Sequence, residues 1–136
     1  SEVFLTEKRN NRVLGTQKEN IAAKFLQKQG YTIVQMNFRC RQGEIDIIAQ
    51  KDNILSFVEV KTRSKNSMYS PREAVNYAKQ RRIILTASIY LAKYPSKLQP
   101  RFDVIEVVME SPSSLKVSEI NHIQGAFDAG DLRSSF

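Results

Sequence analysis

The chain has 136 residues, of which 41% are hydrophobic and 26% are charged, a composition typical of one globular domain. It has no run of about 18 apolar residues that could span a bilayer, and its first residues lack the apolar stretch of a signal peptide. The single cysteine, Cys40, excludes an internal disulfide and a cysteine-based zinc site. We therefore expect one soluble, cytoplasmic domain over residues 1–136 without membrane contact, and flexible termini at residues 1–13 and 128–136.

Positive charge is concentrated in two segments of the chain. The net charge is +7; residues 1–43 contain eight basic and three acidic residues, and residues 68–101 contain seven basic and one acidic. The segment between them is neutral, and its acids gather at a few positions. This pattern suggests a polyanionic partner that approaches a carboxylate site. A general solubility charge explains the composition equally well.

The first half of the chain predicts one helix and three strands. Apolar residues at intervals of three and four predict an amphipathic helix from Leu14 to Gln29, with Gly30 as its C-terminal cap. Residues 31–39, 44–50 and 54–63 are rich in β-branched and aromatic residues and predict three strands. Short turns join them, so we expect an antiparallel meander.

A second helix is predicted from the sequence SPRE to about Lys93. Ser70 would be its N-cap, Pro71 its first residue and Glu73 the partner in a capping box. The helical wheel places Arg81 on the buried side. The expected buried face consists of Tyr77, Ile84 and Leu91 together with Ala74, Ala78, Leu85, Ile89 and Ala92, and the expected polar stripe of Lys79, Arg82, Thr86 and Lys93.

The last part of the chain predicts a further strand over residues 101–110 and a weaker one over residues 115–120. The remaining tail is polar, although Ala126 and Phe127 could dock on the body of the protein. The order is therefore α-β-β-β-α-β with one extra strand. It predicts an α/β fold with a mixed central β-sheet flanked by helices, because the long second helix allows a parallel crossover.

Acidic residues occupy positions in strands that are otherwise apolar. Strand alternation places Glu44 and Asp46 on one face of the second strand, and Ile45 and Ile47 on the other. Glu59 lies within the third strand. Burying an ionised carboxylate without a partner is costly, so we expect a metal ion or a lysine to compensate these acids.

Twelve residues separate Asp46 from Glu59, and Lys61 lies two residues after that glutamate on the same strand face. Two carboxylates on adjacent strands can hold Mg²⁺, which binds through a few carboxylates, several waters and substrate phosphate. A lysine beside them could orient a water or stabilise developing charge. A buried Asp-Lys or Glu-Lys ion pair is the alternative, and the spacing alone does not decide between the two.

Three blocks of the sequence carry a family resemblance: GTQKENIAAKFLQKQGYTIVQMNFRCRQGEIDIIA, LSFVEVKTRS and RFDVIEV, with PREAVNYAKQRR between the last two. They closely resemble the YraN-like family of small bacterial proteins, which is similar to the PD-(D/E)xK nucleases with a restriction-endonuclease-like core. The resemblance implies that Asp46 and Glu59 bind Mg²⁺, with Mn²⁺ as a substitute, and that Lys61 is the catalytic lysine. It also implies that Glu19 is a fourth polar group of the site and that Glu44 is an accessory ligand or a structural acceptor.

Glu19 lies at the edge of the apolar stripe of the first helix, from which it can lean over the sheet. A solvated helix glutamate is the alternative. Members of the family usually have glycine immediately before this glutamate, where the present chain has Lys18.

Basic residues surround the predicted site. Such a surface can contact phosphates without reading base sequence; ordinary solvation is the alternative. We assign no role to Cys40, a loop thiol, or to His122, a surface imidazole. The predicted nucleic-acid contacts are Arg39, Arg41, Arg63, Lys79 and Arg82.

The sequence thus favours a Mg²⁺-dependent nuclease that hydrolyses DNA phosphodiester bonds and recognises DNA structure, as repair or recombination nucleases do. The alternative is a noncatalytic nucleic-acid-binding accessory protein that retains the nuclease fold. A purely structural partner protein would explain the basic segments but not the inward acids. The sequence leaves open DNA versus RNA, endonucleolytic versus exonucleolytic cleavage, and the oligomeric state.

Overall fold

The computed structural model describes residues 17–67 and 75–130. Of the termini expected to be flexible, residues 1–13 and 131–136 lie outside the described residues, whereas residues 128–130 are described. The predicted capping box at residues 70–73 also lies outside the described residues. The first helix is described over residues 17–28. The other elements are β1 (Thr32–Cys40), β2 (Gly43–Lys51), β3 (Ile54–Ser64), α2 (Tyr77–Lys93), β4 (Gln99–Met109) and β5 (Val117–Phe127).

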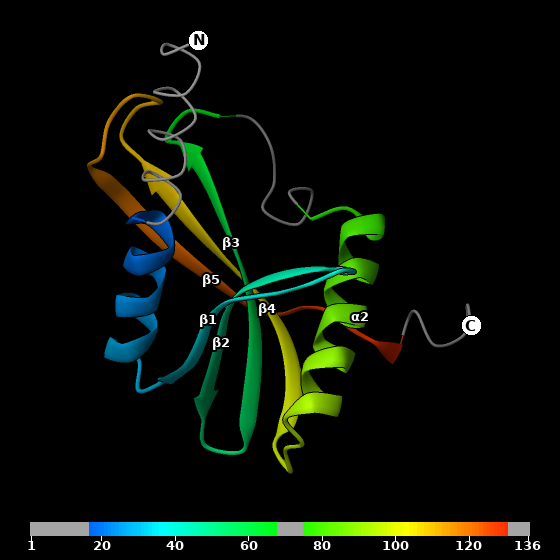
Figure 1. The fold of residues 1–136 in the computed structure, drawn as a ribbon. Coiled ribbons are helices and arrows are strands. Elements are labelled where there is room, and N and C mark those ends of the chain that lie inside the picture. Colours follow the sequence, from blue (N-terminus) through cyan, green and yellow to red (C-terminus); the bar gives the residue numbers. More distant parts are fainter. Residues whose placement is uncertain (1–16, 68–74, 131–136) are drawn as a thin grey trace, which may run out of the picture.

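The five strands form one mixed sheet in the order β1-β2-β3-β4-β5 (Figure 1). All neighbours are antiparallel except β3 and β4, which run parallel because α2 carries the chain back between them. This confirms the predicted α/β fold with a mixed sheet. The weak final strand is longer than expected, since β5 extends to Phe127, and Ala126 and Phe127 pack against the core as predicted.

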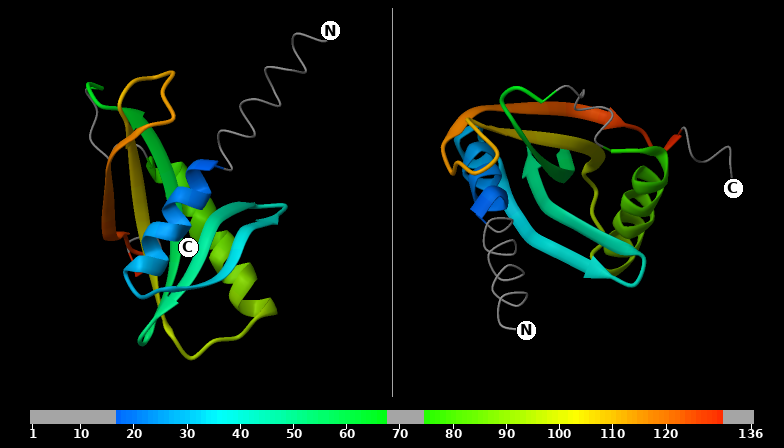
Figure 2. Two further views of the ribbon diagram at one scale, coloured as in Figure 1. Left: turned by 90° about the vertical axis from the view of Figure 1, so that its left-hand side faces the viewer. Right: turned by 90° about the horizontal axis from the view of Figure 1, so that it is seen from above.

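The two helices lie on opposite faces of the sheet (Figure 2) and create two separate cores. Interior strands are therefore apolar on both faces. None of the helices in the described ranges is long and apolar enough to cross a membrane. The core under the first helix includes Ala22, Leu26, Ile47, Val58, Ile105 and Val107, and the core under α2 includes Ile83, Ala87, Tyr90, Ile48, Phe57 and Phe102.

The end of the first helix is the predicted glycine cap. Gly30 has a φ of 94°, a left-handed conformation that residues with a Cβ rarely adopt. The backbone N–H groups of Gly30 and Tyr31 donate to the carbonyls of Gln27 and Leu26, each at 3.0 Å. These bonds satisfy carbonyl groups of the last turn and direct the chain into β1.

The start of the second helix was predicted wrongly. The structure begins α2 at Tyr77, because Asn76 has an extended backbone (ψ 169°) and its side chain accepts a hydrogen bond from the Lys79 N–H at 2.9 Å. Asn76 is therefore the N-cap. Val75, which the prediction placed inside the helix, forms a bend and is buried in the core.

The buried face of α2 was predicted correctly only in part, since Ile84, Ile89 and Leu91 pack against the core as expected. Tyr77 and Leu85 are 51% and 40% exposed, and Arg81 is exposed rather than buried. Thr86, assigned to the polar stripe, is fully buried. The turn between β1 and β2 lies against this side of the helix, so closely that a Cβ on Gly43 would come within 3.0 Å of the Thr86 hydroxyl. The buried face of the helix therefore includes a polar residue, Thr86, beside the apolar Ile83, Ala87 and Tyr90.

The β1–β2 hairpin bends sharply at its middle. Phe38 and Ile45 are paired across it and pack toward α2, whereas the next pair, Met36 and Ile47, packs toward the first helix. The expectation that Ile45 and Ile47 share a face was therefore wrong. Asn37 lies at the bend with a φ of 52°, which interrupts the regular alternation of an extended strand.

A fully buried aspartate joins the centre of the sheet to its edge. Asp103 on β4 accepts hydrogen bonds from the Ser56 hydroxyl at 2.6 Å and the Gly125 N–H at 3.0 Å, and the Arg101 guanidinium binds both carboxylate oxygens. His122 Nε2 lies 2.8 Å from the same carboxylate. Burial alone would raise the pKa of Asp103, but the bonds from His122, Arg101 and Ser56 hold it well below its usual range.

His122 is consequently not the surface imidazole that the sequence suggested. Its side chain is only 9% exposed and lies edge-on to the rings of Phe25 and Tyr31. Arg101 also donates to the Tyr31 hydroxyl at 2.6 Å. The network therefore ties β5 and the first helix to β4.

We predict that Asp103→Asn lowers the free energy of unfolding at pH 7 by about 3 kcal/mol, because the variant leaves Arg101 without its charged partner. Because the pKa of Asp103 is lower in the folded protein than the value of about 4 in the unfolded chain, its carboxylate stabilises the fold at pH values above about 4. This contribution is lost as the pH falls below that value toward the pKa of the folded protein. Urea unfolding of both proteins at pH 7 and in acid measures the difference, which should shrink in acid. Glu119→Gln, at an exposed β5 position, is the control; a difference that is equal at both pH values would contradict the prediction.

Candidate active site

The candidate site lies where β2 separates from β3. The pairing of the two strands begins at the pair Lys51–Ile54 and ends at the pair Ile47–Val58. Beyond this last pair the β1–β2 hairpin turns toward α2 (Figure 1). The Val60 N–H donates instead to a carboxylate oxygen of Asp46 at 2.8 Å. Asp46 is only 7% exposed, so its carboxylate is fixed between the two diverging strands.

Glu59 extends from β3 toward α2 and is 6% exposed. It shares this strand face with Leu55 and Phe57, which pack in the core under α2. Two lysines contact its carboxylate: Lys79 Nζ lies 2.6 Å from Oε1, and Lys61 Nζ lies 3.7 Å from the same atom. Lys61 comes from the same strand, whereas Lys79 belongs to the first turn of α2.

The electrostatics of Asp46 are unfavourable to its charged form. Burial raises the pKa of Asp46 to about 8; the negative charge of Glu59 is the next largest cause, and Glu19 and Glu44 add to it. The hydrogen bond from the Val60 N–H opposes this shift. The four acids are therefore close enough to repel one another, and a positive charge placed among them would be strongly favoured.

The two lysines respond in opposite ways. Burial lowers the pKa of Lys61, and the neighbouring Lys79 lowers it further through a hydrogen bond and its charge. Burial would also lower the pKa of Lys79, but its hydrogen bonds to Glu59 and Lys61, together with the negative charges of Glu59 and Asp46, outweigh that effect and raise it. Lys79 is thus the permanently charged partner of Glu59, and the Lys61 amine lies directly beside it.

Glu19 on the first helix also reaches the site. Its carboxylate is hydrogen-bonded to the side chain of Asn37, and burial raises its pKa, with contributions from the charges of Glu44 and Glu59. The sequence analysis did not identify Asn37 as a residue of the site. An asparagine inside an apolar strand could have indicated it, because asparagine adopts positive φ more readily than most residues.

The rim of the site is formed by the hairpin turn and α2. Arg39 Nε lies 2.8 Å from a carboxylate oxygen of Glu44, and both side chains are exposed. Arg41 is exposed in the turn. A small cavity of about 160 Å³ between these elements is lined by Gly43, Glu44, Glu59, Lys79, Arg82 and Ile83.

Arg63 lies apart from this rim. Its guanidinium is 3.0 Å from the carboxylate of Glu106 on β4, and its side chain is 16% exposed. Asn121 donates a second bond to Glu106 at 3.0 Å. The sequence analysis did not single out the buried Glu106, although an acid within the apolar run of β4 could have indicated it. Arg63 is therefore committed to an internal ion pair.

Asp46 and Glu59 suit a hard divalent cation. Within residues 17–67 and 75–130, no three histidine, cysteine or acidic side chains come close enough to form a complete metal cage. Mg²⁺ does not need one, because it binds through one or two carboxylates and completes its shell with waters and phosphate. Burial and the negative charges of the neighbouring acids raise the pKa of Asp46, and a bound cation would offset both effects.

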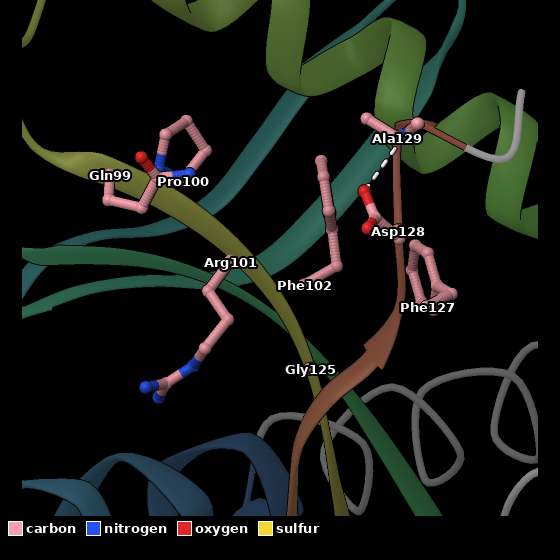
Figure 3. Close-up of a pocket in the computed structure, with 9 residues that line it drawn as sticks. Gln99, Pro100, Arg101, Phe102, Gly125, Phe127, Asp128 and Ala129 are labelled. Carbon is pink, nitrogen blue, oxygen red and sulfur yellow. Dashed lines mark hydrogen bonds between the residues drawn. The ribbon is translucent and has the colours of Figure 1, made fainter. Parts of the chain in front are cut away.

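A second cavity, of about 400 Å³, lies between β4 and β5 and is shown in Figure 3. Phe102 and Phe127 lie stacked on one side of it, with ring centroids 5.2 Å apart. Arg101 lines its edge, but its guanidinium points away from the two rings toward Asp103. The carboxylates of Asp46 and Glu59 are not among the residues that line this cavity.

The comparisons with known proteins agree with one another. The sequence pattern of the Uncharacterised protein family UPF0102 matches residues 18–107, which include both acids and both lysines of the site. A UPF0102 protein of the bacterium Caldanaerobacter subterraneus subsp. tengcongensis is 45% identical over 122 residues, which cover 89% of this chain and 99% of the relative. A UPF0102 protein of Clostridium perfringens is 48% identical over 121 residues, or 88% of this chain and 98% of the relative. The chain therefore belongs to the UPF0102 family, the YraN-like group that its motifs resemble.

Proposed function

We propose that the protein is a metal-dependent nuclease that hydrolyses DNA phosphodiester bonds in the cytoplasm and selects its substrate by DNA structure. One observation carries the proposal: two buried carboxylates that interact through their charges lie, with two lysines on one of them, where β2 and β3 separate. A purely structural site would bury fewer like charges, because each needs compensation. The clustered acids are instead what binding of a cation and a phosphate requires.

In this proposal Asp46 and Glu59 hold Mg²⁺, which would neutralise phosphate charge and lower the pKa of a bound water. The Val60 N–H fixes the Asp46 carboxylate, so this ligand is oriented before the cation arrives. Lys61 lies beside Glu59 and orients the attacking water or stabilises the developing negative charge. Glu19, held by Asn37, extends the acidic side of the site.

Basic side chains near the site would bind the DNA backbone. Arg41 and Arg82 are exposed, and Arg39 is exposed beside Glu44. Contacts to phosphate oxygens do not depend on base identity. Selection would then come from the shape of the DNA, as in branched or processed structures.

A noncatalytic nucleic-acid-binding protein is the second candidate, and one observation favours it. Glu59 is already paired with Lys79 at 2.6 Å, so part of the buried negative charge is compensated without a cation. In that case the acids and lysines would hold β2, β3 and α2 together, and the basic rim would still bind DNA. Cleavage assays on variants that remain folded separate the two functions.

We predict that Asp46→Asn lowers the rate of Mg²⁺-dependent DNA cleavage by about 100-fold or more, because it removes a charged oxygen ligand. The variant should be at least as stable as the parent, since its amide oxygen can still accept from the Val60 N–H and one buried charge is gone. Cleavage of duplex, flap and four-way DNA and thermal melting are measured together. Unchanged cleavage in Mg²⁺ and in Mn²⁺ would contradict the metal site.

The second variant tests the chemical role of Lys61. We predict that Lys61→Met keeps most of the DNA affinity and the fold, because Lys79 remains on Glu59, but loses most of the cleavage. Lys65→Met, at an exposed lysine just beyond the end of the same strand, is the matched control and should cleave normally. A Lys61 variant that melts much earlier yet still cleaves like the parent would show that this lysine is structural.

The third prediction concerns binding. We expect DNA affinity to fall steeply with salt, by a slope of about 0.9 in the logarithm for each phosphate contact, because bound lysines and arginines release counterions. Fluorescence anisotropy with labelled duplexes of two unrelated sequences, without divalent cations, measures the slope. Both sequences should behave alike. An affinity that does not change with salt would exclude nucleic acid as the main partner.

A further inference from the structure

We propose that the Lys79 ammonium is a displaceable internal counter-ion, which occupies the place of the divalent cation at Glu59 and must leave before the cation binds. The inference rests on the proposed function and deepens it, because it assigns Lys79 to the control of the metal site. The sequence had placed this lysine only among the phosphate contacts of an outer helix face.

The geometry of the contact carries the inference. Lys79 Nζ is 2.6 Å from Glu59 Oε1, a short, charge-assisted hydrogen bond to a carboxylate that is only 6% exposed. Lys61 lies farther away, at 3.7 Å from the same oxygen. A cation coordinated by that oxygen would stand where the ammonium now stands, and the ammonium and the cation would repel each other strongly at that distance.

Lys79 has somewhere to move. It projects from the first turn of α2, and its side chain is one-third exposed. The 160 Å³ cavity beside it is also lined by the half-exposed carboxylate of Glu44, so the ammonium can exchange Glu59 for Glu44 or for solvent. A four-carbon stem allows this movement while the helix stays in place.

Removing the ammonium should therefore strengthen cation binding. Mn²⁺ titrated by calorimetry into the full chain, without DNA, should bind Lys79→Met on the order of tenfold more tightly than the parent, because no hydrogen bond to a charged group has to be broken. A merely structural lysine gives the opposite result, since its loss disorders Glu59 and weakens binding. If Lys79→Met does not fold, Lys79→Gln, which keeps a neutral hydrogen-bond donor, should bind more tightly in the same way.

Two control variants separate displacement from a general change of charge. Arg82→Met removes one positive charge from the lining of the same cavity, without a contact to Glu59 Oε1 of the kind Lys79 makes. Lys93→Met removes one positive charge about 21 Å from Lys79 along the helix. Both should change the Mn²⁺ affinity much less than Lys79→Met.

The possible failures have different meanings. Equal Mn²⁺ affinity of the parent and Lys79→Met would overturn the counter-ion role while leaving the metal site intact. Equal tightening by Arg82→Met would overturn it too, because net charge would then explain the effect. If neither the parent nor the Lys79 variants bind Mn²⁺, the proposed function itself fails and the inference with it.

Discussion

The separation of β2 from β3 is the constraint on which the rest of the site depends. A buried peptide N–H that loses its partner in the sheet must find another acceptor. At this point the Asp46 carboxylate receives the Val60 N–H, so an acidic side chain takes the place of a strand carbonyl. The hairpin is then free to turn toward α2, where Gly43 packs against Thr86. Because the hairpin leaves β3, Glu59 has no partner on β2 although it stays paired with β4, and its side chain lines a small cavity.

Two buried aspartates show how differently one fold treats its acids. Asp103 accepts hydrogen bonds from several donors, among them Ser56 and Arg101, and its pKa is held well below the usual range. Asp46 receives the Val60 N–H but is surrounded by other carboxylates, so that burial and Glu59 raise its pKa to about 8. The first arrangement stabilises the folded state. The second costs stability in the absence of a cation, and such a cost is expected where binding or catalysis requires the arrangement.

Much of the fold could be predicted from the sequence because its strands are apolar runs bounded by turns. The start of α2 could not, since Ser70 and Asn76 are both good N-caps and only the packing of Val75 into the core favours the later one. The prediction of the buried face of α2 failed in part for a similar reason. A helical wheel treats Thr86 as polar, whereas the hairpin turn that covers it is more than forty residues earlier in the chain. Local patterns do not contain such long-range contacts.

The same reasoning explains which parts of the site could be foreseen. Asp46 and Glu59 could be placed together because they lie on strands that follow each other and pair. The contact of Lys79 with Glu59 could have been predicted with one further step of sequence analysis. It lies four residues before the buried Ile83, so its stem points toward the sheet as Ile83 does. A lysine in that position is stable only where the sheet offers an acid in place of an apolar side chain, and Glu59 is that acid. A charge that interrupts the buried stripe of a helix therefore indicates its partner on the opposite strand.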